Sequence, residues 1–205
     1  MIICDHQHRG KPHKPGQFGA AHDLDGDGKQ ERHEVETYLV ESYIAAASLE
    51  AAMAGERFVL LADGHYRTRH EVAGDLAAAL YEERVAYFAC HLNSAETPGN
   101  YAAVFYDARS TGGQALAWEV AEELKTLEEL GGNVRLVPAS EARGARALSV
   151  IRRIYNQPGN ISGICLEPAF INQPDHADLL TAEGLARIGR AVARGALRWV
   201  REESP

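Results

Sequence analysis

The chain has 205 residues, of which 45% are hydrophobic and 24% are charged. This length and apolar content suit one globular domain with a single core, and they exclude a disordered or low-complexity chain. Its 21 lysines and arginines are outnumbered by 29 aspartates and glutamates, so the formal net charge is -8. Because that charge repels phosphate backbones and anionic bilayers, we expect neither a nucleic acid nor a membrane surface as the main partner.

The amino terminus and the cysteines indicate a protein made and folded in the cytoplasm. The apolar run that starts at Met1 ends at Asp5, which is unlike a signal peptide, and no stretch approaches the roughly 20 apolar residues that cross a bilayer. The cysteines Cys4, Cys90 and Cys165 are odd in number and widely spaced. Reduced thiols therefore fit this chain better than a disulfide scaffold.

Short apolar runs alternate with long helical patterns, which is typical of an α/β fold with a mostly parallel sheet. The runs predict strands at residues 2–5, 57–61, 85–90, 102–106, 133–137 and 162–166. Helical patterns lie at residues 34–54, 68–83, 111–130, 142–155 and 181–202. No internal repeat and no long linker divides the chain. We expect a single domain over residues 1–205, with a twisted, mostly parallel six-stranded sheet flanked by helices.

One connection, from His6 to His33, is too long for a plain turn and is rich in Gly, Pro, Asp and His. Within it, an insertion at about residues 22–34 matches the D-x-D-x-D-G-x5-E pattern of a calcium-binding loop. The predicted ligands are the side chains of Asp23, Asp25, Asp27 and Glu34 and the backbone carbonyl of Lys29. No amphipathic helix precedes the loop, which excludes a paired EF-hand domain. Two interpretations remain: a single calcium ion, structural or regulatory, or a turn that only caps the next helix.

The first long helix carries an acid on its apolar face. Leu39, Tyr43 and Ile44 follow the spacing of a buried helical face, and Glu36 lies three residues before Leu39 on that face. Its carboxylate is therefore aimed at the interior. It can serve either as a functional group of a site or as a first-turn acid that interacts favourably with the positive end of the helix dipole. Glu34 and Glu36 are about 200° apart around a helix, so the two can serve different metals.

Three polar residues, His8, His91 and Glu167, follow the carboxyl ends of three predicted strands. Ligands bind at that edge of open α/β sheets. Two imidazoles, the inward-facing Glu36 and a further carboxylate can form a catalytic zinc site with three protein ligands, an open position for water and a base. Taken singly, each residue also fits a structural role, such as a hydrogen-bonded histidine or a helix cap.

These motifs resemble the zinc-dependent N-acetylmuramoyl-L-alanine amidases of the Amidase_3 type, from the first strand to the last helix. Residues 2–10 are similar to the opening strand and D-P-G-H-G-G turn, 15–19 to P-G-x-x-G, 69–74 to R-x-x-x-A-N, 87–94 to the S-I-H-A-N segment, and 164–172 to V-E-x-G-F-I-S-N. The departures from these motifs are His6-Gln7 in place of Pro-Gly, Arg9 and Ala169 in place of Gly, and Gly74 in place of Asn. The motifs are weak singly, but in this order and at these distances they are strong.

The resemblance implies a zinc ion held by His8, Glu36 and His91, with Glu167 as the catalytic residue. In that family a glutamate ligand opens a helix that ends about 19 residues later at a glycine, and counting back from Gly55 gives Glu36. His6 remains a rival for the first ligand. Two further residues are candidates for substrate binding: Asn93, and Arg152, which fits equally well as a solvated helix charge.

The reaction implied by the resemblance is hydrolysis of the amide between N-acetylmuramic acid and L-alanine in peptidoglycan. Zinc would polarise the amide carbonyl and lower the pKa of its water, and Glu167 would pass the water's proton to the leaving amine. The chain resembles a phage endolysin that waits in the cytoplasm until a membrane pore releases it to the cell wall. A cytoplasmic recycling amidase fits equally well.

Two other classes stay open. One is another zinc peptidase or amidohydrolase that acts on peptidoglycan peptides, although the H-x-x-E pattern usual in carboxypeptidases does not follow His8. The other is a non-catalytic peptidoglycan-binding module, which we would expect to lack Glu167 or a metal ligand. The oligomeric state is left open.

Overall fold

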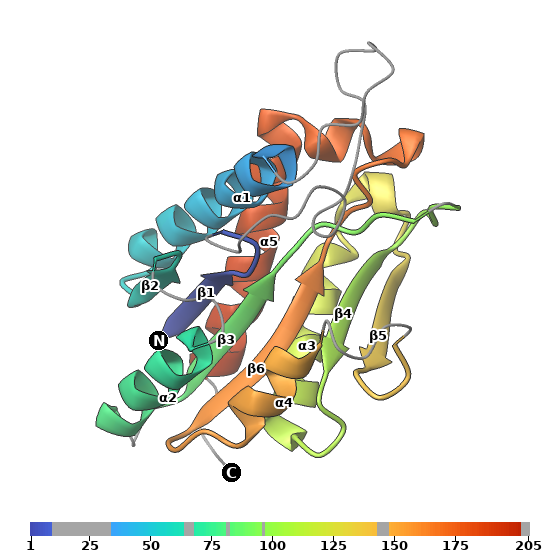
Figure 1. The fold of residues 1–205 in the computed structure, drawn as a ribbon. Coiled ribbons are helices and arrows are strands. Elements are labelled where there is room, and N and C mark those ends of the chain that lie inside the picture. The colour runs from blue at the N-terminus through green and yellow to red at the C-terminus, as the bar shows by residue number, and fades with distance from the viewer. Residues whose placement is uncertain (10–33, 64–67, 81–82, 96, 143–147, 202–205) are drawn as a thin grey trace.

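In a computed structural model, which describes residues 1–9, 34–63, 68–80, 83–95, 97–142 and 148–201, the six apolar runs form one sheet (Figure 1). Its strands are β1 (Ile2–His6), β2 (Phe58–Leu61), β3 (Val85–Cys90), β4 (Ala102–Tyr106), β5 (Val134–Pro138) and β6 (Ile161–Glu167). The helices are α1 (Glu34–Met53), α2 (Arg69–Ala79), α3 (Thr111–Leu124), α4 (Ser149–Tyr155) and α5 (Ala182–Arg201). Short 3-10 turns lie at Glu128–Leu130, Pro174–His176 and Asp178–Leu180. Within these residues, no helix is long and apolar enough to cross a membrane.

The strand order in the sheet is β2-β1-β3-β6-β4-β5. Strands β2, β1, β3 and β6 are parallel to one another, so their carboxyl ends meet at one edge. β4 and β5 are parallel to each other, but β4 runs antiparallel to β6. The expected mostly parallel α/β sheet is confirmed, and the reversed pair forms an extension of the sheet beside β6.

Helices cover both faces of the sheet and divide the core into two layers (Figure 1). Alternate strand residues such as Ile2, Phe88 and Ile164 pack against α1, α3 and α5. The residues between them, such as Ile3 and Tyr87, pack against α2 and α4. This alternation follows from the pleat, which sends successive side chains to opposite faces, and it explains why the central strand β3 is buried along its whole length.

The predicted helix at residues 111–130 is shorter in the structure. α3 ends at Leu124, where the Thr126 hydroxyl donates to the carbonyl of Glu123, and a 3-10 turn follows. The turn stops at Gly131, whose φ of 53° lies in the left-handed region that ends helices. Apolar spacing continued past this point because the turn also buries Leu130, so the pattern alone did not mark the end of the helix.

Candidate active site and metal centre

The segment that leaves β1 is held against α1 on both sides of His8. The fully buried His6 donates from Nε2 to the carbonyl of Thr37 at 3.0 Å, and burial lowers its pKa. Arg9 forms an ion pair with Glu41 of α1. His8 therefore lies between two anchors to the helix that also carries Glu36.

A buried arginine fixes the backbone of the same segment. Arg69, only 2% exposed at the start of α2, donates to the carbonyls of His6 and Arg9, each at 2.6 Å. It also bonds the carbonyl of Ala62 at 2.6 Å and the carboxylate of Asp5 at 3.2 Å. Because these bonds reach the backbone on both sides of His8, they determine where the imidazole can lie.

Asp5 sits at the centre of this polar cluster below the site. Its carboxylate accepts from Tyr87, Gln7 and Arg69, and all of these groups are buried. Burial raises the pKa of Asp5, and the bonds from Tyr87 and Arg69 oppose that shift. Such a fully bonded network gives the β1 end one defined geometry.

Glu36 and His91 are positioned by contacts between the first turn of α1 and the end of β3. Glu36 is 1% exposed, and its Oε1 accepts from the backbone N–H of Leu92 at 3.2 Å. The Tyr43 hydroxyl, further along α1, donates to the carbonyl of His91 at 3.2 Å. The apolar face of α1 thus seats the helix on the sheet, and the same packing brings its acid to the carboxyl edge, as the sequence predicts.

The three candidate ligands come together at this edge. Nδ1 of His8 donates to Oε2 of Glu36 at 2.8 Å, and Nδ1 of His91 lies 3.9 Å from Oε1. The two imidazole rings are 4.5 Å apart between centroids, and one ligand atom from each of the three residues lies within 4.8 Å of the others. Two imidazoles and a carboxylate at this spacing are a suitable donor set for zinc, which would replace the proton that His8 shares with Glu36.

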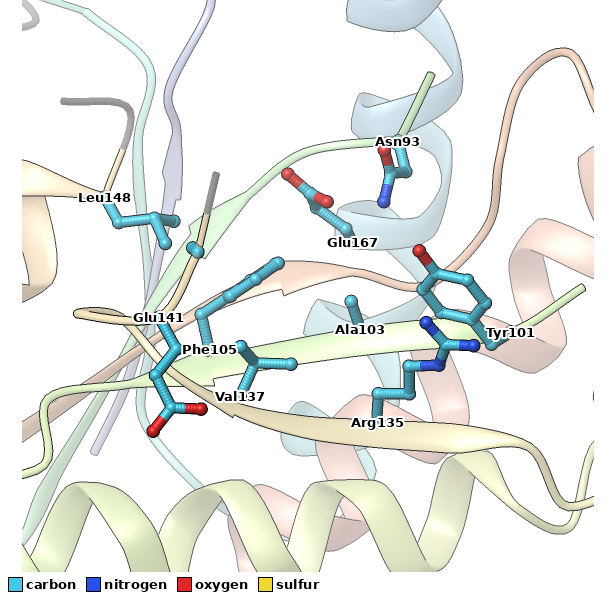
Figure 2. Close-up of a pocket in the computed structure, with 10 residues that line it drawn as sticks. Asn93, Tyr101, Ala103, Phe105, Arg135, Val137, Glu141, Leu148 and Glu167 are labelled. Atoms are coloured by element: carbon cyan, nitrogen blue, oxygen red, sulfur yellow. The ribbon is translucent and has the colours of Figure 1, made fainter. Parts of the chain in front are cut away.

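Glu167 ends β6 beside this cluster and projects into a cavity of about 570 Å³ (Figure 2). Burial and then the charge of Glu36 raise its pKa from an ordinary 4.5 to about 7. Asn93 lines the same cavity, and its backbone pairs with Ala169 and Ile171 in the segment after Glu167. A carboxyl group with a pKa near neutrality can both accept and return a proton.

The remaining candidates lie elsewhere. His6 is bonded to α1 and is not a member of the three-residue cluster, so the structure favours His8 over its rival. Arg152 lines a separate cavity with Asp107 and Arg109, which shares none of its lining residues with the cavity of Glu167.

The predicted calcium ligands fall mostly outside the described residues. Asp23, Asp25, Asp27 and Lys29 lie in residues 10–33, which the structure does not describe. For Glu34, the structure gives only its place at the first residue of α1. The calcium site therefore remains a prediction.

Several residues that shape the site were not assigned a role from the sequence. Arg69 was noted only as part of a motif, and its burial is what gives it a positioning role. Tyr101, the residue before β4, and Arg135 of β5 line the cavity, and no motif pointed to them. The alternation of side chains along each strand could have placed them on one face, but not beside Glu167.

Comparison with known proteins identifies the fold. No family model and no curated protein matches the sequence. Among solved structures, the chain is similar to Cwp6 from Clostridium difficile, with a TM-score of 0.67 and 19% identity over 98% of this chain and 29% of that one. It is similar to the N-acetylmuramoyl-L-alanine amidase AmiC2 of Nostoc punctiforme, with a TM-score of 0.65 and 18% identity over 98% and 97%. It is also similar to the catalytic domain of the CD27L endolysin targeting Clostridia Difficile, with a TM-score of 0.52 and 14% identity over 97% of each chain.

The chain therefore has the α/β fold of N-acetylmuramoyl-L-alanine amidases, as the motif order predicts. It spans 29% of the length of Cwp6 and nearly the whole of the other two chains. At these identities the similarity defines the fold, and the chemistry has to be argued from the site.

Proposed function

We propose that the protein is a zinc-dependent N-acetylmuramoyl-L-alanine amidase that cleaves peptidoglycan between N-acetylmuramic acid and L-alanine. The observation that carries this proposal is the convergence of His8, Glu36 and His91 next to Glu167 at the carboxyl edge of the sheet. The fold supports it, because structures such as AmiC2 have the same fold and are named as amidases of this type.

Each residue of the site has a defined part in this reaction. His8, Glu36 and His91 would hold the zinc ion, which when bound supplies a Lewis acid for the amide carbonyl and for water. Glu167 accepts the proton of the attacking water and delivers it to the leaving amine of L-alanine. Burial is the larger cause of its raised pKa, and because burial persists when the ion is bound, it helps Glu167 to return the proton to the amine. Asn93 lines the same cavity as Glu167, and we propose it as a substrate-binding residue.

Cleavage products distinguish this activity from the alternatives. We expect purified peptidoglycan to release glycan strands without peptides, together with intact stem peptides that start at L-alanine, as measured by mass spectrometry. Shortened peptides would instead indicate a peptidase, and binding without any product would indicate a non-catalytic module. The same assay, applied to walls of different composition, tests an endolysin-like action on the cell wall.

The ligand set is tested separately by metal analysis. We expect His91→Ala to lose most of its zinc, at least tenfold in affinity, because two donors hold the ion far less well than three. Arg152→Ala is the matched control, since its cavity is separate from the cluster. A full equivalent of zinc in His91→Ala would contradict the assignment.

A further inference from the structure

Arg135 lies in the same row of the sheet as Glu167. Ala103 of β4 is the register partner of Glu167 on one side and of Arg135 on the other. Partners on adjacent strands face the same side, and strands are about 4.8 Å apart, so the Cα atoms of Glu167 and Arg135 are separated by roughly 10 Å. The side chain between them is a single methyl group, and all three residues line the cavity of about 570 Å³ (Figure 2).

The guanidinium of Arg135 is held by a stack of aromatic rings. It lies 3.6 Å from the centre of the Tyr101 ring, and Tyr101 packs edge to face on the buried Phe170, with centroids 5.0 Å apart. Phe170 is anchored in turn because its backbone N–H donates to Nδ1 of the buried His176 at 2.9 Å. This platform restricts Arg135 before any ligand arrives, which lowers the entropy lost on binding.

The charge of Arg135 has no acidic partner within the described part of the chain. The arginines of α5 contrast with it, since Arg187 and Arg194 are paired with glutamates. Glu141 also lines the cavity, but it lies at the opposite end from Arg135 (Figure 2). In a molecule with a net charge of -8, this positive end of the cavity offers a local site for an anion.

The proposed substrate narrows the identity of that anion. The lactyl carboxyl group of muramic acid is consumed in the scissile amide, and the N-acetylated sugars carry no other charge. A carboxylate that reaches Arg135 while the amide lies at Glu167 must therefore belong to the peptide. An extended chain covers about 3.3–3.6 Å per residue, so a distance of roughly 10 Å corresponds to the second or third residue.

We propose that Arg135 binds a carboxylate of the second or third residue of the stem peptide and so directs the peptide from Glu167 across β4 to β5. This inference rests on the amidase activity proposed above, and it makes the peptide's carboxylates, rather than the glycan, the source of specificity. A planar guanidinium donates two parallel hydrogen bonds to the two oxygens of a carboxylate. A carboxamide has the same shape, but one of those oxygens is replaced by an NH2 group, which cannot accept the second bond.

The test uses four synthetic N-acetylmuramoyl tripeptides that differ only in two groups. The second residue is a D-glutamate linked through its γ-carboxyl group, and its α-carboxyl group is either a free carboxylate or a carboxamide. The carboxyl terminus of the peptide is varied independently in the same way. We expect the wild-type protein to cleave one or both carboxylate-bearing forms with a kcat/KM roughly 10- to 100-fold above that of the doubly amidated form. In Arg135→Gln, kcat/KM for the carboxylate-bearing forms should fall to near the value for the doubly amidated form, so that the preference is lost, and Arg135→Lys should keep part of the preference.

Arg190→Gln is the control for net charge, because it removes the same charge from α5 on the other side of the sheet and should keep the wild-type preference. Equal cleavage of all four substrates by the wild type, or an unchanged preference in Arg135→Gln, overturns the inference while the amidase activity stands. An equal loss on all four substrates in Arg135→Gln also overturns it, since that pattern indicates a structural role. If the wild type cleaves none of the four, the proposed amidase activity fails and this inference fails with it.

Discussion

Glu167 has to remain reactive in surroundings that oppose its charge. The carboxyl group is buried, and the negative charge of Glu36 lies close enough to raise its pKa further. A cation held by His8, Glu36 and His91 would offset the charge of Glu36. The acidity of Glu167 is thus expected to depend on whether the metal site is filled.

The catalytic role of Glu167 is tested by Glu167→Gln. The amide keeps the shape of the side chain but cannot accept the proton, so we expect kcat on peptidoglycan fragments to fall by about 10² to 10⁴. Zinc content, measured in the same preparation, should stay at the wild-type level because Glu167 is outside the ligand cluster. Near-normal turnover would place the base on another residue.

The raised pKa of Glu167 also predicts a pH-dependent effect on stability. In the folded state the ionised form is disfavoured, so the free energy of unfolding decreases as the pH rises from 4.5, the ordinary pKa, to about 7. Glu167→Gln removes this penalty. In metal-free protein we expect the variant to gain about 1–3 kcal/mol relative to the wild type between pH 5 and pH 8, as measured by urea unfolding. The same difference at both pH values would contradict the assigned shift.

At the scale of elements, the position of Glu36 depends on how closely α1 packs on α5. The two helices lie side by side on one face of the sheet (Figure 1). Gly189 of α5 permits this contact, because a Cβ there would lie 2.2 Å from the carbonyl oxygen of Tyr43. Tyr43 is also the residue that bonds the backbone of His91. The packing of α1 on α5 therefore affects the positions of both Glu36, which α1 carries, and His91, whose backbone Tyr43 contacts.

We predict that Gly189→Ala destabilises the protein by about 1–3 kcal/mol, although alanine favours helices over glycine, since the backbones of α1 and α5 must separate. A shift in the urea midpoint measures this effect. Gly112→Ala in α3 is the control, because its added Cβ would come within 2.3 Å of the Ser162 hydroxyl, which can rotate away, and would meet the next nearest atoms at an ordinary 3.5 Å. Equal effects of the two substitutions would show that backbone contact is not the cause.

At the scale of the whole molecule, the candidate ligands are separated by long stretches of chain. His8, Glu36 and His91 come from the end of β1, the start of α1 and the end of β3. They meet only when the sheet and α1 are assembled, so an ion bound there stabilises the folded state alone. The predicted calcium loop would act in the same way, since it leads directly into the first residue of α1.

For calcium, we predict a rise of several degrees in the melting temperature when the ion is added to chelated protein with zinc held saturating. An ion that binds only the folded state at a hundredfold excess over its Kd contributes about 2.7 kcal/mol. Asp25→Ala combined with Asp27→Ala should abolish the rise, as followed by differential scanning calorimetry. An unchanged melting temperature in the wild type would leave the loop as a turn that caps α1.

The sequence by itself determined the α/β class, the approximate position of each strand and the inward direction of Glu36. These properties are local, because they follow from the two-residue period of strands and the 3.6-residue period of helices. The order of the motifs also pointed to His8, His91 and Glu167, since residues that follow parallel strands gather at one edge. The fold and the grouping of three candidate ligands were accessible on this basis.

Only the tertiary structure decided the reversed direction of β4 and β5, the burial of Arg69 and the place of Arg135 beside Glu167. Each depends on strand order and register, which arise from contacts between residues far apart in the chain. A shift of one residue in the pairing of β4 would turn Ala103 and the cavity wall to the other face. Local periodicity specifies that a side chain faces one side of a sheet, but the neighbour it meets there is selected by the packing of the whole sheet.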